Sequence, residues 1–222
     1  MTSAVDRLRR RLRHCVGADH GLTLIEMMVT LLLMGIVGTI MFASVVSVTQ
    51  TLTHSQANSD SLDIARIGMN RLAKTVRSGM SIQQNGSADL PPLVEISPNK
   101  LTVYASLGTV PAMVTYSIDS NRQLVENWYA GVAASSPYWT FSSTSRTEVV
   151  ARQIPASAAP LFTFLDTNGA PIANQTSTNV ADLSLVHGVA INLTIDSNPA
   201  KGGGPVTLAN TVTMPNQGIA KR

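Results

Sequence analysis

An uncharged apolar segment near the N-terminus constrains the fold of this chain more than any other feature. Residues 27–48 read MMVTLLLMGIVGTIMFASVVSV, with no ionisable side chain, and Glu26 directly precedes them. As a helix, this segment extends for about 33 Å at about 1.5 Å per residue, which matches the hydrocarbon core of a bilayer. The sequence therefore predicts a membrane-spanning helix at the N-terminal end of the chain.

The segment in front of the apolar run is basic, and it carries the whole net charge of the chain. Five arginines and two aspartates lie within residues 1–21 and account for the formal charge of +3, so the remainder is neutral. Because basic residues stay on the cytoplasmic side of a membrane, the C-terminal part is expected outside the cytoplasm. A neutral folded part has no net field to attract phosphate, so no nucleic-acid contact is predicted for it.

The junction between the basic and apolar segments carries a family resemblance. Residues 21–26 read GLTLIE, and together with the basic leader and the apolar run they resemble the N-terminus of type IV prepilins and type II secretion pseudopilins. That family usually has Phe after the glycine, where this chain has Leu22. The resemblance implies cleavage by a prepilin peptidase between Gly21 and Leu22, N-methylation of Leu22, and assembly into a filament through the N-terminal helix.

Glu26 is the single ionisable side chain between Gly21 and Val48. A carboxylate in a membrane-embedded helix costs about 2.5–3.5 kcal/mol near the bilayer centre and less toward its surface, so it normally has a partner. Cleavage after Gly21 would place a new amine on Leu22, one helical turn from Glu26. In the family that it resembles, this glutamate pairs with the N-terminal amine of an adjacent subunit during assembly. The alternatives are a glutamate directed to the lipid headgroups and a Gly21 that acts only as a hinge.

Two other interpretations of the apolar run remain open. Small residues at Ala43, Ser44 and Ser47 could supply a signal-peptidase site, which would release a soluble secreted domain. A permanent, uncleaved signal anchor could instead hold an extracytoplasmic binding or enzymatic domain. Neither alternative explains Gly21 or Glu26.

The residues after the apolar run keep a helical period but become amphipathic. An apolar stripe with steps of three and four residues indicates one buried helix face; its members are Leu62, Ala65, Met69, Leu72 and Val76. A polar face lies beside it at Arg66, Asn70, Lys74 and Arg77. Gly79 is a candidate left-handed stop, and Ser59 or Asp60 would cap a second helix if the first broke near His54. No proline precedes Pro91, so a nearly continuous helix over residues 22–78 is expected.

Beyond Pro91 the apolar period changes to two, which predicts strands. An Asp119-Ser120-Asn121 turn predicts a hairpin, Asp166-Thr167-Asn168-Gly169 predicts another turn, and residues 206–214 are expected to close the sheet. The expected strands are residues 93–96, 100–105, 113–118, 122–128, 139–141, 148–154, 161–165, 185–195 and 206–214. The predicted fold class is α+β: a long N-terminal spine helix, hydrophobic in its inner half and amphipathic in its outer half, packed on an antiparallel, pilin-like β-sheet domain.

Three stretches are similar to minor pilins of the PilW and PulJ (GspJ-like) kind. They are the aromatic strand and turn at residues 162–169, the closing strand at residues 211–216, and the spacing of Arg66, Leu72 and Arg77 after the membrane segment. This resemblance favours a minor subunit over a major one.

The sequence holds no recognisable catalytic, cofactor or metal motif, so the chain is not expected to be an enzyme. Its four histidines (His14, His20, His54, His187) are scattered, and its only cysteine, Cys15, lies in the leader. His187 is expected as a packed or edge residue of a strand. The oxygens of the turn at residues 166–169 could touch calcium, although a purely structural turn is preferred.

The expected organisation is a cleaved basic leader (1–21), a transmembrane assembly helix (22–48), its amphipathic continuation (49–79) and an extracytoplasmic β-rich domain (80–222). The expected partners are other pilins or pseudopilins, the prepilin peptidase, the pilus assembly platform and membrane lipid. The expected location is the inner membrane before assembly and the pilus or pseudopilus afterwards. The sequence does not choose between a DNA-uptake pilus, an adhesive or motility pilus and a secretion pseudopilus.

Overall fold

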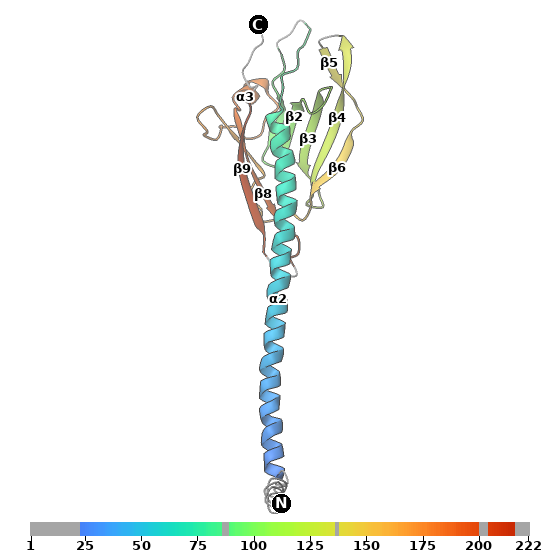
Figure 1. The fold of residues 1–222 in the computed structure, drawn as a ribbon. Helices are drawn as coiled ribbons and strands as arrows, with labels where there is room; N and C mark the ends of the chain where they lie inside the picture. The colour runs from blue at the N-terminus through green and yellow to red at the C-terminus, as the bar shows by residue number, and fades with distance from the viewer. Residues whose placement is uncertain (1–22, 86–88, 136–137, 200–203, 216–222) are drawn as a thin grey trace, which may run out of the picture. The chain divides into compact units, whose positions relative to one another are not determined.

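The chain divides into two compact units, residues 1–51 and residues 52–222. A computed structural model describes residues 23–85, 89–135, 138–199 and 204–215. One helix supplies all the described secondary structure of the first unit, and the second unit adds two antiparallel sheets (Figure 1). The expected α+β fold class is confirmed.

Helix α2 (Leu24–Arg77) is 54 residues long, which confirms the predicted spine helix. It continues through His54, so Ser59 and Asp60 lie inside it and cap nothing. Its stripe of Ala65, Met69, Leu72 and Val76 is buried and Leu62 is half-buried, while the polar residues on the neighbouring face are exposed. The period of three and four therefore identified the packed face correctly.

The end of α2 differs from the prediction. The prediction that Gly79 adopts the left-handed conformation is wrong. Among the described glycines, only Gly169 and Gly204 have a positive φ. Gly79 instead forms a β-bridge with Ala105, so the chain leaves the helix directly into extended pairing. A Cβ at Gly79 would lie 2.9 Å from Met214 Cε and 3.1 Å from the Val76 carbonyl oxygen. Close packing, rather than backbone handedness, accounts for a glycine at this point.

The larger sheet has six strands. Its strands are β1 (Leu93–Ser97), β2 (Lys100–Ala105), β3 (Ala112–Ile118), β4 (Leu124–Ser135), β5 (Tyr138–Phe141) and β6 (Arg146–Ala151). The first four follow one another in antiparallel order, and both β5 and β6 pair with β4. The first part of β4 pairs with β6 and the last part with β5, so one strand of 12 residues serves two partners. The hairpin predicted around residues 119–121 joins β3 to β4.

The last three strands form a sheet of their own. Its order is β7 (Phe162–Leu165), β8 (Gly188–Ile195) and β9 (Val206–Thr213), all antiparallel. The expectation that residues 206–214 close a single sheet is therefore wrong. The strand expected from residue 185 also begins later, because a short helix, α3 (Val180–Ser184), is capped by Asn179 and ends at Leu185. His187 thus precedes β8 and is not a strand residue.

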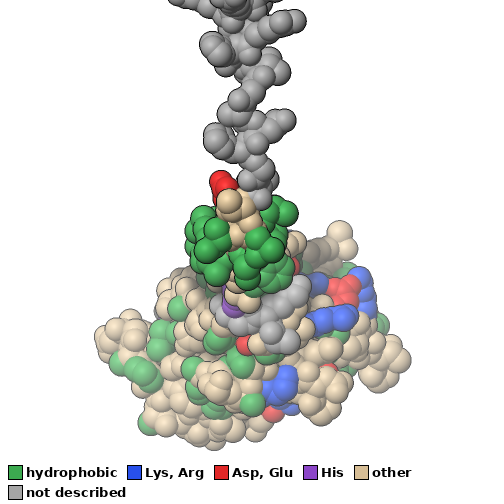
Figure 2. Space-filling model, turned by 90° about the horizontal axis from the view of Figure 1, so that it is seen from below, with side chains coloured by type: hydrophobic (Ala, Val, Ile, Leu, Met, Phe, Trp, Pro, Cys, Tyr) green, Lys and Arg blue, Asp and Glu red, His purple; other side chains and the backbone are tan. Residues whose placement is uncertain are grey.

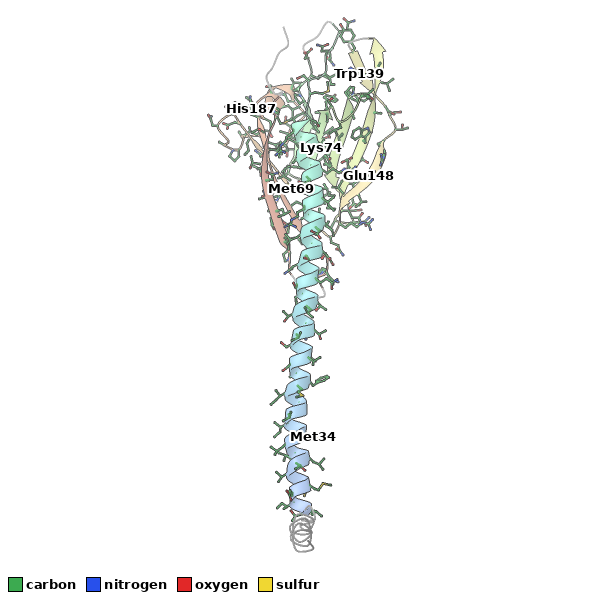
Figure 3. All side chains as sticks on the ribbon, viewed as in Figure 1. Met34, Met69, Lys74, Trp139, Glu148 and His187 are labelled. Carbon is green, nitrogen blue, oxygen red and sulfur yellow. The ribbon has the colours of Figure 1, made fainter. Side chains whose placement is uncertain are left out.

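The outer part of α2 packs on both sheets and completes their common core. An added Cβ at Gly68 would lie 3.0 Å from Leu193 of β8 and 3.6 Å from Val150 of β6, so the helix backbone closely approaches both sheets here. Figure 3 labels one methionine in each unit: Met34 is 75 % exposed, whereas Met69 is 6 % exposed. The described core begins only where α2 enters the second unit.

Candidate functional site

The first turn of α2 holds the one carboxylate of the apolar segment. Thr23 precedes the helix and accepts two hydrogen bonds: its Oγ1 from the Glu26 N–H at 3.3 Å and its carbonyl oxygen from the Met27 N–H at 3.1 Å. Glu26 therefore lies at the N-terminal end of the helix dipole, where a negative charge is favourable. Its side chain is exposed and forms no ion pair with any described residue.

The helix surface after Glu26 suits a nonpolar medium on all sides. Large side chains such as Leu32, Met41 and Phe42 are more than half exposed, and Figure 2 shows hydrophobic side chains around the helix when it is seen from below. Several hydroxyl groups of this part of the helix bond to carbonyl oxygens one turn earlier; examples are Ser44 to Ile40 at 2.9 Å and Thr49 to Val45 at 2.8 Å. These hydroxyls therefore carry no unsatisfied donor into lipid. By length and composition, α2 could cross a membrane.

Gly21 and Leu22 lie outside the described residues, so the predicted cleavage and methylation positions have no described geometry. The structure places Glu26 two residues inside the start of α2. It does not bring any described cation to this carboxylate. A partner for Glu26 would have to come from residues outside the described ranges or from another molecule.

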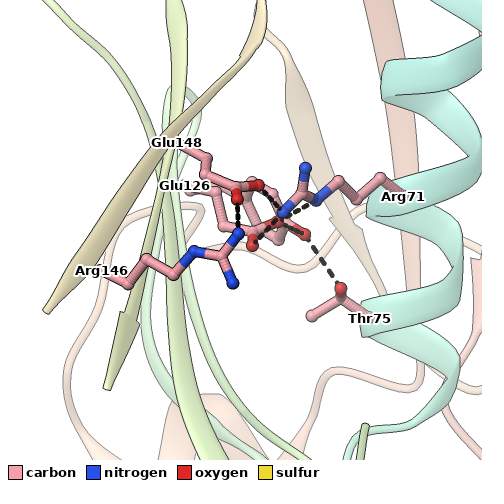
Figure 4. A network of polar contacts seen from close by, with 6 residues as sticks. Arg71, Thr75, Glu126, Arg146 and Glu148 are labelled. Carbon is pink, nitrogen blue, oxygen red and sulfur yellow. Dashed lines mark hydrogen bonds and ion pairs between the residues drawn. The ribbon is translucent and has the colours of Figure 1, made fainter. Parts of the chain in front are cut away.

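A second polar group lies in the unit formed by residues 52–222, which we call the outer unit, and joins α2 to the six-stranded sheet (Figure 4). Arg71 of α2 contacts Glu126 of β4 through two nitrogens, Nε at 2.8 Å from Oε2 and Nη2 at 2.9 Å from Oε1. Arg71 also bonds to Glu148 of β6, which in turn pairs with Arg146. We call these four residues, together with Tyr116 of β3 and Thr75 of α2, the helix–sheet network.

The centre of the helix–sheet network is buried. Tyr116 donates its hydroxyl proton to Glu126 Oε2 at 2.6 Å, and its oxygen lies 2.9 Å from Thr75 Oγ1. Because Tyr116 has one hydroxyl proton, Thr75 must be the donor in the second contact. Burial and the Glu126 carboxylate raise the pKa of Tyr116, so it stays protonated. Burial opposes the charge of Arg71, yet its hydrogen bonds to Glu148 and Glu126 raise its pKa overall.

The sequence did not indicate the helix–sheet network. Glu126 lies two residues after buried Leu124, so the two side chains share one face of the strand. A charge at an inward-facing position was the one sequence feature that could have indicated a buried partner. Its cation lies 55 residues earlier on a helix, so spacing alone could not identify the pair. The contacts of Arg71 with Glu126 and Glu148 link α2 to the six-stranded sheet and fix how α2 lies on it.

The turn at residues 166–169 is held by its own hydrogen bonds. The Oδ1 of Asp166 accepts from the N–H groups of Asn168 at 2.8 Å and Ala170 at 2.9 Å, and these bonds lower the pKa of its carboxyl group. Gly169 adopts the left-handed conformation, with φ of 77°. Within the described ranges, no group of three or more His, Cys, Asp or Glu residues could hold a metal ion.

Comparison with known proteins identifies the N-terminal segment. Residues 17–42 match the family model of the prokaryotic N-terminal methylation motif. The matched range contains Gly21, Leu22 and Glu26 together with most of the apolar segment. Neither the curated proteins nor the solved structures give a match to this chain. The chain thus carries the N-terminal motif of the type IV prepilin-like family, which overlaps the start of α2 and precedes an antiparallel β domain.

Proposed function

We propose that this protein is a minor pilin or pseudopilin, a structural subunit cut between Gly21 and Leu22 and methylated on the Leu22 amine. It is then assembled through α2 into a type IV pilus or a type II secretion pseudopilus. The observation that carries the proposal is the methylation motif over residues 17–42. In this proposal the protein catalyses no reaction of its own, and the leader, residues 1–21, is removed.

Glu26 directs assembly in this proposal. Its carboxylate is exposed at the first turn of an otherwise apolar helix, and no described residue neutralises it. A methylated Leu22 amine of a neighbouring subunit would supply the missing positive charge. In a medium of low dielectric such a pair is strong and sets the register of one helix against the next. The partners are therefore other pilins or pseudopilins, the prepilin peptidase, the assembly platform and, before assembly, lipid of the inner membrane.

The mass of the mature N-terminal peptide tests the proposal. We expect protein isolated from its native membranes to begin at Leu22 and to carry one added methyl group. A Gly21→Leu variant should keep the leader, because a side chain at this position blocks the peptidase cleft. An intact Met1, or a cut near residues 43–47, would contradict the proposal and favour a signal-anchored or secreted domain.

Assembly is tested separately with Glu26→Gln, which keeps the size of the side chain and removes its charge. We expect this variant to be cut after Gly21 yet to be depleted from sheared filament fractions. A matched Thr30→Val change, in the same apolar segment, should leave incorporation unchanged. Normal incorporation of Glu26→Gln would remove the proposed role of the carboxylate.

A further inference from the structure

Strand β9 presents an unpaired edge on the outer unit. Its eight residues pair with β8 along their whole length without a register shift, and they pair with no other described strand or bridge. In Figure 1, β9 lies at the margin of the three-stranded sheet. We call this unpaired side of Val206–Thr213 the β9 edge.

The alternation of hydrogen bonds along β8 shows which backbone N–H and C=O groups of β9 face outward. Asn192 of β8 donates its N–H to the Leu161 carbonyl oxygen at 2.8 Å, so its backbone groups point away from β9. In antiparallel pairing, its partner Ala209 then directs its own N–H and C=O away from β8. By alternation, the same holds for Thr207, Thr211 and Thr213, and all four of these residues are exposed. Eight backbone groups therefore face outward without a described partner.

The opposite edge of the same sheet is capped within the chain. On β7, Phe162 donates its N–H to the Pro98 carbonyl oxygen at 2.9 Å. The side chain of Gln175 accepts from the Phe164 N–H at 2.8 Å and donates to the Phe164 carbonyl oxygen at 2.9 Å. The fold thus satisfies three of the four outward backbone groups of β7, whereas those of β9 have no described partner.

The composition of the β9 edge does not protect it from pairing. Its sequence, VTLANTVT, has no charge and no proline, and the neighbouring outward positions Thr163, Ala190, Asn192 and Thr194 are also uncharged. Soluble proteins usually guard an exposed edge with lysine, proline, a bulge or a covering segment. An extended segment that adds to this edge would find eight matching backbone groups and no repelling charge.

We propose that the β9 edge receives an uncharged extended segment of a different pilin-type subunit, which adds a fourth strand to the sheet. The strip that such a strand covers is about 27 Å long and about 5 Å wide. That is far smaller than the roughly 800 Å² that each partner contributes to a stable interface. The edge alone therefore could not retain a freely diffusing protein. It could retain a neighbour that is already held alongside by its own N-terminal helix, because tethering raises the effective concentration. The inference thus rests on the proposed filament assembly.

Two ways of placing a second copy of this chain against the β9 edge are unfavourable. β9 runs in the same direction as the outer part of α2, because Ser197 contacts Ser61 at one end and Met214 contacts Gly79 at the other. Antiparallel pairing of two β9 edges would set those two helix segments antiparallel, whereas subunits anchored in one membrane run side by side. Copies related by translation would place β9 against β7, whose edge is capped.

The other described edges of a second copy match poorly as well. β6 carries Arg146 and Glu148 of the helix–sheet network, and β1 carries Glu95 and bridges to Ser177 through Ile96. β5 has only four residues. The complementary segment, long and uncharged, is therefore assigned to another subunit.

Photo-crosslinking in the full-length protein tests this inference. The photoreactive residue p-benzoylphenylalanine is placed at Ala209 on the β9 edge or, as the matched control, at Thr163 on β7, and adducts formed in native membranes are identified by mass spectrometry. We expect Ala209 to yield an adduct with another pilin-type subunit and Thr163 to yield none. Thr211→Pro removes one outward N–H and spares the bonds to β8, so it should lower the adduct yield about tenfold.

Two further variants separate loss of pairing from loss of folding. Thr211→Lys keeps the backbone N–H but adds charge to the edge, and it should also lower the yield, whereas Thr211→Val should leave it unchanged. An adduct with a second copy, an adduct only with proteins of other kinds, or equal yields from all variants would overturn the inference. If the mature chain begins at a methylated Leu22 and no Ala209 adduct forms, the inference fails and the proposed function stands.

Discussion

Glu126 is the residue on which the joint between α2 and the six-stranded sheet depends. It is 4 % exposed and accepts hydrogen bonds from Arg71 of α2 and from Tyr116 of β3. A buried charge is tolerated only when its partners replace the water that it lost. Here the two Arg71 contacts and the Tyr116 hydroxyl together replace that water.

The first prediction removes this charge. Glu126→Gln should lower the free energy of unfolding by about 2 kcal/mol, because an amide cannot accept from both Arg71 nitrogens and from Tyr116 at once. Denaturant unfolding of the full-length protein in detergent, followed by tryptophan fluorescence, measures the change. Glu148→Gln serves as the control: it lies at the accessible side of the same network and should cost less. Equal losses for the two variants would show that burial does not determine the strength of the joint.

The second prediction concerns pH. The hydrogen bond and charge of Arg71, with a smaller contribution from Arg146, lower the pKa of Glu148 below its ordinary value. The unfolded chain therefore binds this proton at a higher pH than the folded chain does. Stability from Glu148 is complete above about pH 4.3, the ordinary pKa of Glu, and is lost as the pH falls through the folded-state pKa.

Comparison of the wild type with Glu148→Gln isolates this contribution. Asp166, whose pKa is also lowered, titrates in the same acid range in both proteins and cancels in the difference. The stability difference between wild type and variant should be constant near neutral pH and shrink on acidification below about pH 4.3. A difference that does not depend on pH would contradict the assigned ion pair.

At the scale of elements, α2 combines two surfaces in one helix. Residues 24–51 are exposed all round, whereas from Ala57 onward one face is buried against the two sheets. Leu72 is fully buried on that face, and Ile67 lies on the other side with 66 % of its surface exposed. The two residues are similar in size and differ in environment, so they form a matched pair.

The third prediction uses this pair. Leu72→Ala should lower the free energy of unfolding by about 2–5 kcal/mol, because it leaves a cavity between α2 and both sheets. Ile67→Ala should change it by no more than about 0.5 kcal/mol. Denaturant midpoints of the two variants in the same detergent give the comparison. A large loss of stability for Ile67→Ala would contradict the prediction, because it would mean that this side chain packs against something although it is exposed within the described residues.

Local patterns predicted the elements of this fold better than their pairing. The steps of three and four from Ala65 to Val76 identified the packed face of α2, and alternation located β2 to the residue. The division into two sheets depends on pairings distant in sequence, such as β7 with β8, and no local pattern specifies them. α3 is only five residues long, too short for a periodic signal.

The candidate site shows the same division. The role of Glu26 stays a prediction, although the residue could be singled out from its position at the start of the apolar run, because a charge in such a segment is costly. The contacts of Arg71 with Glu126 and Glu148 could not, since they join residues that only the folded sheet brings together. Gly21 and Leu22 remain predictions from the motif.

At the scale of the whole molecule, the core belongs to one unit. Every described core residue lies at position 57 or later, within the unit formed by residues 52–222. The apolar segment before it contributes no buried side chain. Folding of the outer unit and anchoring in a membrane are therefore separable properties of the chain.

The last prediction follows from this separation. A fragment of residues 52–222 should fold without the apolar segment, with a thermal midpoint within about 4 °C of the full-length protein in the same detergent, since it keeps every described core contact. Circular dichroism at increasing temperature measures both midpoints. A fragment of residues 79–222 is the control: it lacks Leu72 and Val76, so the inner faces of both sheets are uncovered, and it should show no cooperative transition. If residues 52–222 failed to fold while the full-length chain did, the apolar segment would have to stabilise the outer unit, and the two functions of α2 would be coupled through the helix itself.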